Sequence, residues 1–176
     1  MKKLVLVLLI VVVLILAVVG VILYVVFGGA DYDTAYSFQV SRGQLVNPAA
    51  GLTDEEAIAQ FDESFVSYVL VEIKAYNLHE PIFSSDTPEI EITVGEDIYN
   101  AEIIDGKIFV SEGLSDDEDI IISTTAEEGV KMLRDAGYID DSFRDGLSGI
   151  EMTAGKVELF SKGYLEIYSE LTGEEI

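Results

Sequence analysis

The sequence predicts an α+β fold: an N-terminal transmembrane helix, then a layered domain with helices on one face of an antiparallel sheet of about five strands. Three observations predict it. Leu4–Phe27 carries no charged residue, a helix-capping motif begins at Thr53, and short alternating β-type runs follow Pro88. We therefore divide the chain into a transmembrane anchor (1–27), a linker (28–52) and one α+β domain (53–176).

The apolar run, residues 4–27, is long enough to cross a membrane. As a helix it measures about 36 Å, against roughly 30 Å for the hydrocarbon core of a bilayer. Lys2 and Lys3 precede it, and acidic residues follow it. The positive-inside rule then predicts a single-pass protein of the cell membrane, with a cytoplasmic N-terminus and an extracytoplasmic domain.

A cleaved signal peptide is the alternative interpretation of the same run. Gly28 and Ala30 are small residues at the −3 and −1 positions of a cut after Ala30. The apolar part of a signal peptide usually spans roughly 7 to 15 residues, much less than this run. We therefore favour a retained anchor.

The composition is strongly acidic. The chain has 33 acidic and 10 basic residues, for a formal net charge of −23, and every acidic residue follows Ala30. Such a surface repels nucleic acid and anionic headgroups. It fits either a solvated exterior in a saline medium or the binding of divalent cations, and composition does not separate the two. The absence of Cys excludes disulfides and thiolate chemistry.

The domain alternates between helical and β-type patterns. Helical spacing runs from Thr53 to about residue 77, although Val69–Ala75 also alternates enough for a strand. The expected strands are 89–94, 97–104, 107–110, 119–123 and 149–154. The expected later helices begin after Thr124, span about 140–147 with Phe143 and Leu147 buried, and span 156–172 before Gly173.

This order of elements resembles the sterol carrier protein 2 (SCP2) family over residues 53–173. An Asp-rich turn leads into a strand and a Ser/Thr-capped helix at 116–128, and a Gly-led strand (149–154) precedes the closing helix (156–172). The resemblance implies helices on one face of a five-stranded sheet and an apolar tunnel closed by the last helix. It covers element order and apolar spacing, and it includes no diagnostic motif.

The resemblance also implies an apolar ligand site. The residues expected near the tunnel are Phe143, Leu147, Phe160, Tyr164, Ile167 and Tyr168. Apolar residues at helical spacing are also what an ordinary core requires, so solid packing stays open as an alternative. The expected function is a membrane-anchored, non-enzymatic binder of lipid or another apolar molecule. The alternative is a structural or adhesive envelope protein that acts through its acidic surface, with divalent cations.

No residue set predicts catalysis. His79 is the single histidine, and Ser148 in Gly146-Leu-Ser-Gly149 is one residue short of a nucleophile elbow. Carboxylates at Asp31/Asp33, at 116–119 and at 140–145 are of the type that binds Ca²⁺ or Mg²⁺. The loop from Asp141 lacks the ligand spacing of a calcium loop, and we interpret the clusters as solvated turns. We expect no enzymatic activity, no cofactor and no metal site.

Overall fold

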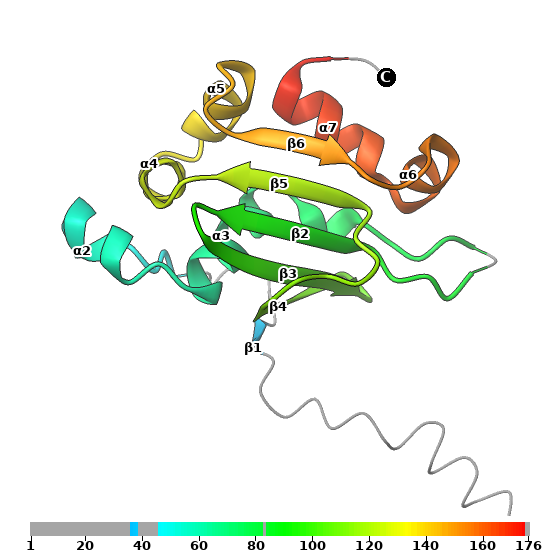
Figure 1. Ribbon diagram of the computed structural model, residues 1–176, viewed down its shortest axis with the longest axis horizontal. Coiled ribbons are helices and arrows are strands. Elements are labelled where there is room, and N and C mark those ends of the chain that lie inside the picture. The colour runs from blue at the N-terminus through cyan, green and yellow to red at the C-terminus, as the bar shows by residue number, and fades with distance from the viewer. Residues whose placement is uncertain (1–35, 39–45, 83, 175–176) are drawn as a thin grey trace, which may run out of the picture. The chain divides into compact units, whose positions relative to one another are not determined.

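The computed structural model describes residues 36–38, 46–82 and 84–174, which form a six-stranded mixed sheet with helices over one face (Figure 1). The strands are β1 (Tyr36–Phe38), β2 (Glu89–Val94), β3 (Asp97–Ile104), β4 (Lys107–Glu112), β5 (Ile120–Thr124) and β6 (Gly149–Met152). The helices are α2 (Asp54–Ala59), α3 (Glu63–Glu72), the 3-10 helix η1 (Ala75–Asn77), α4 (Ala126–Arg134), α5 (Tyr138–Arg144), α6 (Lys156–Lys162) and α7 (Tyr164–Thr172).

The sheet is mixed, whereas the sequence predicted an antiparallel one. Its strand order is β1-β4-β3-β2-β5-β6. The meander β2-β3-β4 is antiparallel as predicted, but β5 crosses to the far side of β2 and pairs with it in parallel. Alternating apolar residues reveal a strand but not its neighbour, so the prediction of an all-antiparallel sheet was wrong at this pair.

Asp119 fixes the parallel pair at its start. Its backbone N–H donates to the Glu89 carbonyl, and its Oδ2 accepts from the Glu89 N–H, both at 2.9 Å. Its carbonyl accepts from the N–H groups of Thr153 and Ala154, each at 3.0 Å. One residue therefore joins the beginning of β2, the beginning of β5 and the segment after β6.

A buried ion pair connects Asp119 to the last two helices. Lys162 Nζ lies 2.7 Å from Asp119 Oδ1, and both side chains are 1% exposed. The same Nζ lies 2.9 Å from Asp86 and 3.3 Å from Glu158, and the Tyr164 hydroxyl donates to Asp119 Oδ2 at 2.9 Å. Burial opposes the charge on Lys162, but hydrogen bonds to its carboxylate partners outweigh it and raise the pKa of Lys162.

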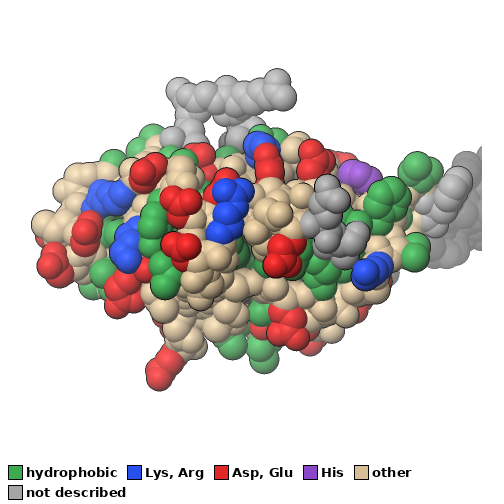
Figure 2. All heavy atoms as spheres, turned by 90° about the horizontal axis from the view of Figure 1, so that it is seen from above, with side chains coloured by type: hydrophobic (Ala, Val, Ile, Leu, Met, Phe, Trp, Pro, Cys, Tyr) green, Lys and Arg blue, Asp and Glu red, His purple; other side chains and the backbone are tan. Residues whose placement is uncertain are grey.

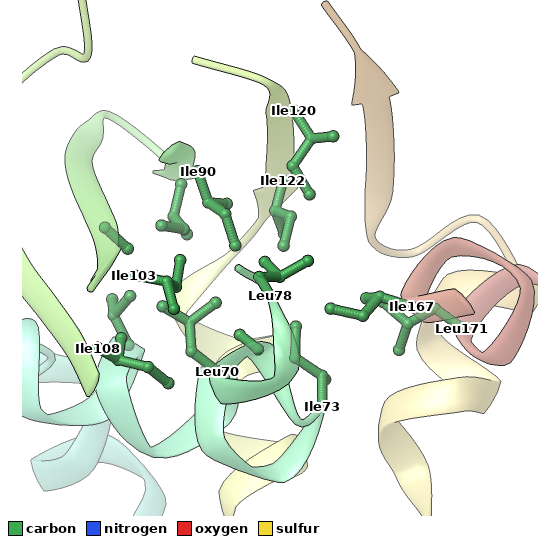
Figure 3. Close-up of a cluster of buried hydrophobic side chains, with 14 of the residues drawn as sticks. Leu70, Ile73, Leu78, Ile90, Ile103, Ile108, Ile120, Ile122, Ile167 and Leu171 are labelled. Atoms are coloured by element: carbon green, nitrogen blue, oxygen red, sulfur yellow. The ribbon is translucent and has the colours of Figure 1, made fainter. Parts of the chain in front are cut away.

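The hydrophobic core lies between the sheet and the helices. Leu70 of α3, its C-cap Ile73 and Leu78 after η1 point toward the isoleucines of β2, β3, β4 and β5 (Figure 3). Ile167 and Leu171 of α7 extend the same cluster. The other face of the sheet carries Glu89, Glu91 and Glu102 among its residues, so the strands alternate as a sheet covered on one face requires.

Two predicted helices are interrupted. The capping box at Thr53 and Glu56 begins α2 as predicted, with hydrogen bonds of 2.9 and 3.2 Å. However, Asp62 starts a separate helix, α3, by accepting from the Ser64 N–H. The closing helix divides into α6 and α7 at Gly163, whose φ of +93° ends one helix and begins the next.

The domain begins earlier than residue 53. β1 pairs with β4, and Ala49 is fully buried in a cluster with residues of α3 and α4. Arg134 donates to the carbonyls of Ala49 and Leu52 at 2.5 and 2.6 Å. The chain divides into compact units between Thr34 and Ala35. The predicted linker, 28–52, thus contributes strand pairing, backbone acceptors for Arg134 and the buried Ala49 to the domain. None of these produces a repeating hydrophobic pattern in the sequence.

The predicted anchor, residues 4–27, lies outside the described residues. Among those that the structure describes, no helix combines the length and the apolar character that crossing a bilayer requires.

Replacing Asp119 tests the buried pair. Asp119→Asn leaves Lys162 without its buried counter-charge, so we expect a loss of about 3 kcal/mol in the free energy of unfolding, measured in urea. The matched control is Asp140→Asn, which breaks the exposed pair with Arg144 and should cost less than about 1 kcal/mol. Equal losses in the two variants would contradict the assignment.

Removing a charge from the open face should stabilise the domain. Glu89 and Glu102 face each other across β2 and β3. Burial raises the pKa of Glu102, and repulsion from the Glu89 carboxylate raises it further. Above that pKa the Glu102 carboxylate costs stability, and the cost disappears as falling pH protonates it. Glu102→Gln should therefore gain roughly 0.5 kcal/mol near neutral pH.

The gain should shrink toward zero in acid, as thermal unfolding across pH would show. Glu96→Gln, in the turn between β2 and β3, is the control and should change little. A gain from Glu102→Gln that persists at low pH would rule out charge repulsion as its cause.

Candidate apolar ligand site

A small cavity lies between the helices and the sheet. Its volume is about 30 Å³, and its walls come from α3, α4, α5, β2 and β5. The lining residues are Phe61, Val66, Val69, Leu70, Ile73, Ile92, Val94, Ile122, Thr124, Gly129, Met132 and Phe143. Part of this wall, Leu70, Ile73 and Ile122, is visible in Figure 3. The cavity therefore lies between the helices and the face of the sheet that they cover.

The cavity wall is apolar. Its one side chain with a polar atom is Thr124, whose hydroxyl forms a 2.8 Å hydrogen bond with the Ser148 hydroxyl. A water molecule needs at least two polar partners to remain in a cavity, and apolar cavities stay dry. The cavity is chemically suited to hydrocarbon.

The cavity is much smaller than a ligand pocket. Pockets for small molecules usually measure roughly 300–1,000 Å³. A volume of about 30 Å³ corresponds to a single water molecule. A ligand can therefore enter only if part of the wall moves.

Phe61 is the part of the wall with the weakest attachment. It lies between α2 and α3, outside both helices, and its side chain is half-buried. Its N–H donates to the Ile58 carbonyl at 3.4 Å, and its carbonyl accepts from the Tyr99 hydroxyl at 3.5 Å. Both hydrogen bonds are long, so they hold this turn loosely.

Gly129 makes room for the Phe61 ring. A Cβ on Gly129 would lie 2.6 Å from Phe61 Cε2, closer than real side chains approach. Glycine in the middle of α4 costs helix stability relative to Ala, roughly 0.5–1 kcal/mol. On its other side the ring lies 5.0 Å from the Phe65 ring, centroid to centroid. The Phe61 ring therefore fills the space between α3 and α4 beside the cavity.

Of the six residues predicted for the tunnel, Phe143 lines this cavity. Tyr164 and Ile167 are buried in the main core but do not line it. Burial raises the pKa of Tyr164, and the negative charge of Asp119 raises it further. The hydroxyl therefore stays protonated and donates to the Asp119 carboxylate. Tyr164 thus belongs to the buried ion-pair network.

The remaining three lie at or near the surface. Phe160 is 73% exposed and Leu147 is 50% exposed, so the predicted burial of Leu147 was wrong. Tyr168 is half-buried, and its hydroxyl donates to Glu174 at 3.1 Å. In α6 it is Lys162 that takes the inward position, which leaves Phe160 outside. The structure does not bring the six residues together, and ligand binding by them stays a prediction.

Sequence reasoning missed the α3 side of the cavity. Residues 65–71 are apolar at five of seven positions, and Phe65, Val66 and Leu70 are buried. A helix that is apolar on more than one face is packed between two neighbours. That run was the available signal, but it did not show which side of α3 leaves a gap.

A chain of hydroxyls runs from the cavity wall to a carboxylate. Ser148 Oγ lies 2.8 Å from Thr124 Oγ1 and 2.9 Å from Ser142 Oγ, and Ser142 donates to Glu128 at 3.3 Å. The hydrogen bond from Lys131 lowers the pKa of Glu128, and this effect exceeds that of burial, which raises it. An ionised Glu128 accepts only, so each hydroxyl hydrogen points toward it.

This chain leaves Ser148 without the partners of a nucleophile. Its hydroxyl bonds to other hydroxyls, whereas His79 is exposed and its Nδ1 lies 3.1 Å from the Glu80 carbonyl. A serine nucleophile requires an adjacent base. The two residues that the sequence raised as catalytic candidates therefore do not meet.

A larger hollow lies on the surface between α2 and α4. It measures about 470 Å³ and is open to solvent. Its wall combines five charged side chains with three apolar or aromatic ones: Asp54, Glu127, Lys131, Arg134 and Asp135, with Ile58, Val130 and Tyr138. Lys131 and Arg134 already pair with Glu128 and Asp54. A hollow that is open to solvent and has five charged side chains in its wall suits an apolar molecule less well than the small cavity, whose wall has no charged side chain.

Several solved structures are similar to this chain, and two of them are described here. A protein titled UbiJ-SCP2 ubiquinone synthesis protein matches 62% of this chain and 81% of its own, with 13% identity and a TM-score of 0.34. The sterol carrier protein 2-like 2 protein of Aedes aegypti matches 56% of this chain and 92% of its own, with 15% identity and a TM-score of 0.33. No family model and no curated protein matches the chain. Both solved structures carry the name of the SCP2 family, which the sequence resembles.

Proposed function

We propose that this domain binds a lipid or another apolar molecule without transforming it. The observation that carries the proposal is the apolar cavity between the helices and the sheet, whose one hydroxyl, that of Thr124, is already hydrogen-bonded to Ser148. Burying a ligand there is favourable by about 25 cal/mol per Å² of apolar surface. The cavity has no nucleophile with an adjacent base in its wall, which supports binding over catalysis.

The cavity must expand to hold a ligand. Movement of Phe61 removes a ring from the space between α3 and α4, while the sheet and α7 stay in place. Dry cavities of about 150 Å³ already bind molecules as large as benzene. Expansion by one aromatic side chain therefore gives room for a segment of a hydrocarbon chain.

We also propose that residues 4–27 anchor the domain to the extracytoplasmic face of the cell membrane. Two observations support this proposal: residues 4–27 carry no charge and are long enough to cross a bilayer, and Lys2 and Lys3 precede them. An anchored domain would remain beside its source of apolar ligand.

Photo-crosslinking tests the binding proposal. Full-length protein in membranes is exposed to a lipid with a photoreactive group on its chain, and labelled peptides are mapped by mass spectrometry. We expect label on the α3 and α4 residues of the cavity. Val94→Phe fills the cavity and should reduce that label several-fold, at an overpacking cost of about 1–3 kcal/mol, and thermal unfolding confirms that the variant is folded.

The matched control is Val157→Phe, because Val157 is 84% exposed on α6. Label confined to residues 4–27, with none in the domain, would contradict the proposal. If calcium then drove self-association, the acidic surface would become the better candidate. Figure 2 shows acidic side chains distributed over one face of the molecule.

Fractionation tests the anchor. Full-length protein should sediment with membranes and resist washing at high salt and high pH, whereas a chain without residues 1–30 should be released. Protease added to intact cells should digest the domain and spare Lys2 and Lys3. A mature chain that begins at Asp31 would instead establish a cleaved signal peptide.

A further inference from the structure

The entrance to the cavity can be located from the secondary structure of its wall. Of the lining residues, Phe61 and Ile73 lie outside helices and strands. Ile73 is the C-cap of α3, is buried, and is held by a 3.0 Å hydrogen bond from its N–H to the Val69 carbonyl, whereas Phe61 is half-buried. Two long hydrogen bonds hold the Phe61 backbone, and its ring rests where Gly129 has no side chain. Moving this ring breaks no helix and no strand pair. Phe61 is therefore the easiest part of the wall to displace.

The surface beside Phe61 is acidic. The Tyr99 hydroxyl donates a hydrogen bond to the Phe61 carbonyl. The charges that shift the pKa of Tyr99 therefore lie near Phe61 as well. Burial raises the pKa of Tyr99 to about 12, and four carboxylates contribute to the increase: Asp97, Glu112, Glu63 and Asp62. Tyr99 also borders an open surface hollow of about 560 Å³, where Glu96, Asp97 and Glu112 supply the charged side chains.

Positive groups near Phe61 are already engaged. The N-terminus of α3 is capped by the Asp62 carboxylate, which accepts from the Ser64 N–H at 2.9 Å. On α4, Lys131 bonds to Glu128 at 2.6 Å, and Arg134 bonds to backbone carbonyls of the preceding segment. An anionic group at this surface would therefore meet carboxylates, while Lys131 and Arg134 are already paired with other groups.

We propose that Phe61 is the gate of the cavity, that a ligand enters tail first between α3 and α4, and that its head group is neutral or cationic. The inference rests on the proposed function and specifies its ligand. The wall accepts only hydrocarbon, so the head group must remain outside. The carboxylates around Tyr99 then disfavour an anionic head and favour a cationic one.

The head-group test uses three single-chain photoreactive probes that share one hydrocarbon chain. Their heads are a sulfate, a hydroxyl and a trimethylammonium group. Full-length protein is labelled in zwitterionic nanodiscs, and label on the α3 and α4 cavity residues is divided by label on residues 4–27. This ratio corrects for the amount of each probe in the bilayer.

We expect the ratio for the sulfate probe to be at least about tenfold lower than for the trimethylammonium probe. The difference should shrink near 1 M salt, where the Debye length is about 3 Å. Asp62→Asn with Glu63→Gln should reduce it as well, and Asn keeps the cap of α3. The control, Asp116→Asn with Asp117→Asn, removes two exposed charges elsewhere and should leave the difference unchanged.

The gate test measures how fast a bound hydroxyl probe leaves when unlabelled lipid is added. Phe61→Ala should accelerate release by roughly tenfold, because an aromatic contact is lost. Gly129→Ala takes away the place where the ring rests and should also accelerate release, while Ala favours the helix. Phe160→Ala, on the exposed side of α6, is the matched control and should not change the rate.

The outcomes separate the two proposals. If none of the three probes labels the cavity residues, the proposed function fails. If all three label them equally, ligand binding stands and the head-group assignment fails. If release from Phe61→Ala and Gly129→Ala matches that of the unmodified protein, the gate is elsewhere.

Discussion

The architecture depends on one buried carboxylate. Asp119 accepts a charge-assisted hydrogen bond from Lys162 and another from Tyr164, and its backbone joins β2 to the segment after β6. Through Lys162 of α6 and Tyr164 of α7, the two closing helices are thereby attached to the start of β5. Buried ion pairs often add little net stability, but they restrict the arrangements that leave no charge unpaired. Here the restriction fixes both the position of β5 and the direction in which α6 faces.

The same interaction explains why the apolar cavity lies away from the last helix. Lys162 and Tyr164 occupy the inward positions next to Asp119, so that end of the core is closed by polar contacts. Ile167 and Leu171 are buried in the main core, and the hollow of about 190 Å³ that Leu171 borders also has charged side chains, including Lys74 and Glu170, in its wall. The apolar gap occurs instead where α3 and α4 meet, because Gly129 has no side chain and a residue outside any helix fills the space. The cavity therefore lies on the α3–α4 side of the core, and polar contacts of Lys162 and Tyr164 close the other end.

Charge and cavity together define the chemistry that the domain suits. The interior offers only hydrocarbon contacts, and the surface near Phe61 is negative, as is the chain overall at −23. An apolar tail with a neutral or cationic head satisfies both conditions. An anchor at residues 4–27 would keep such a domain beside the bilayer, where molecules with apolar tails are concentrated.

Local patterns in the sequence determined most of the elements. The capping box at Thr53, the alternation of 89–94 and 97–104, and the helix end at Gly173 depend on neighbours a few residues away, so they were predictable. The tertiary structure alone decided that β5 pairs with β2, that Lys162 rather than Phe160 faces inward, and that Phe143 alone of the predicted residues lines the cavity. These features depend on contacts such as Asp119–Lys162, which join residues 43 positions apart. Periodicity records which residues are buried, but not what each one is buried against.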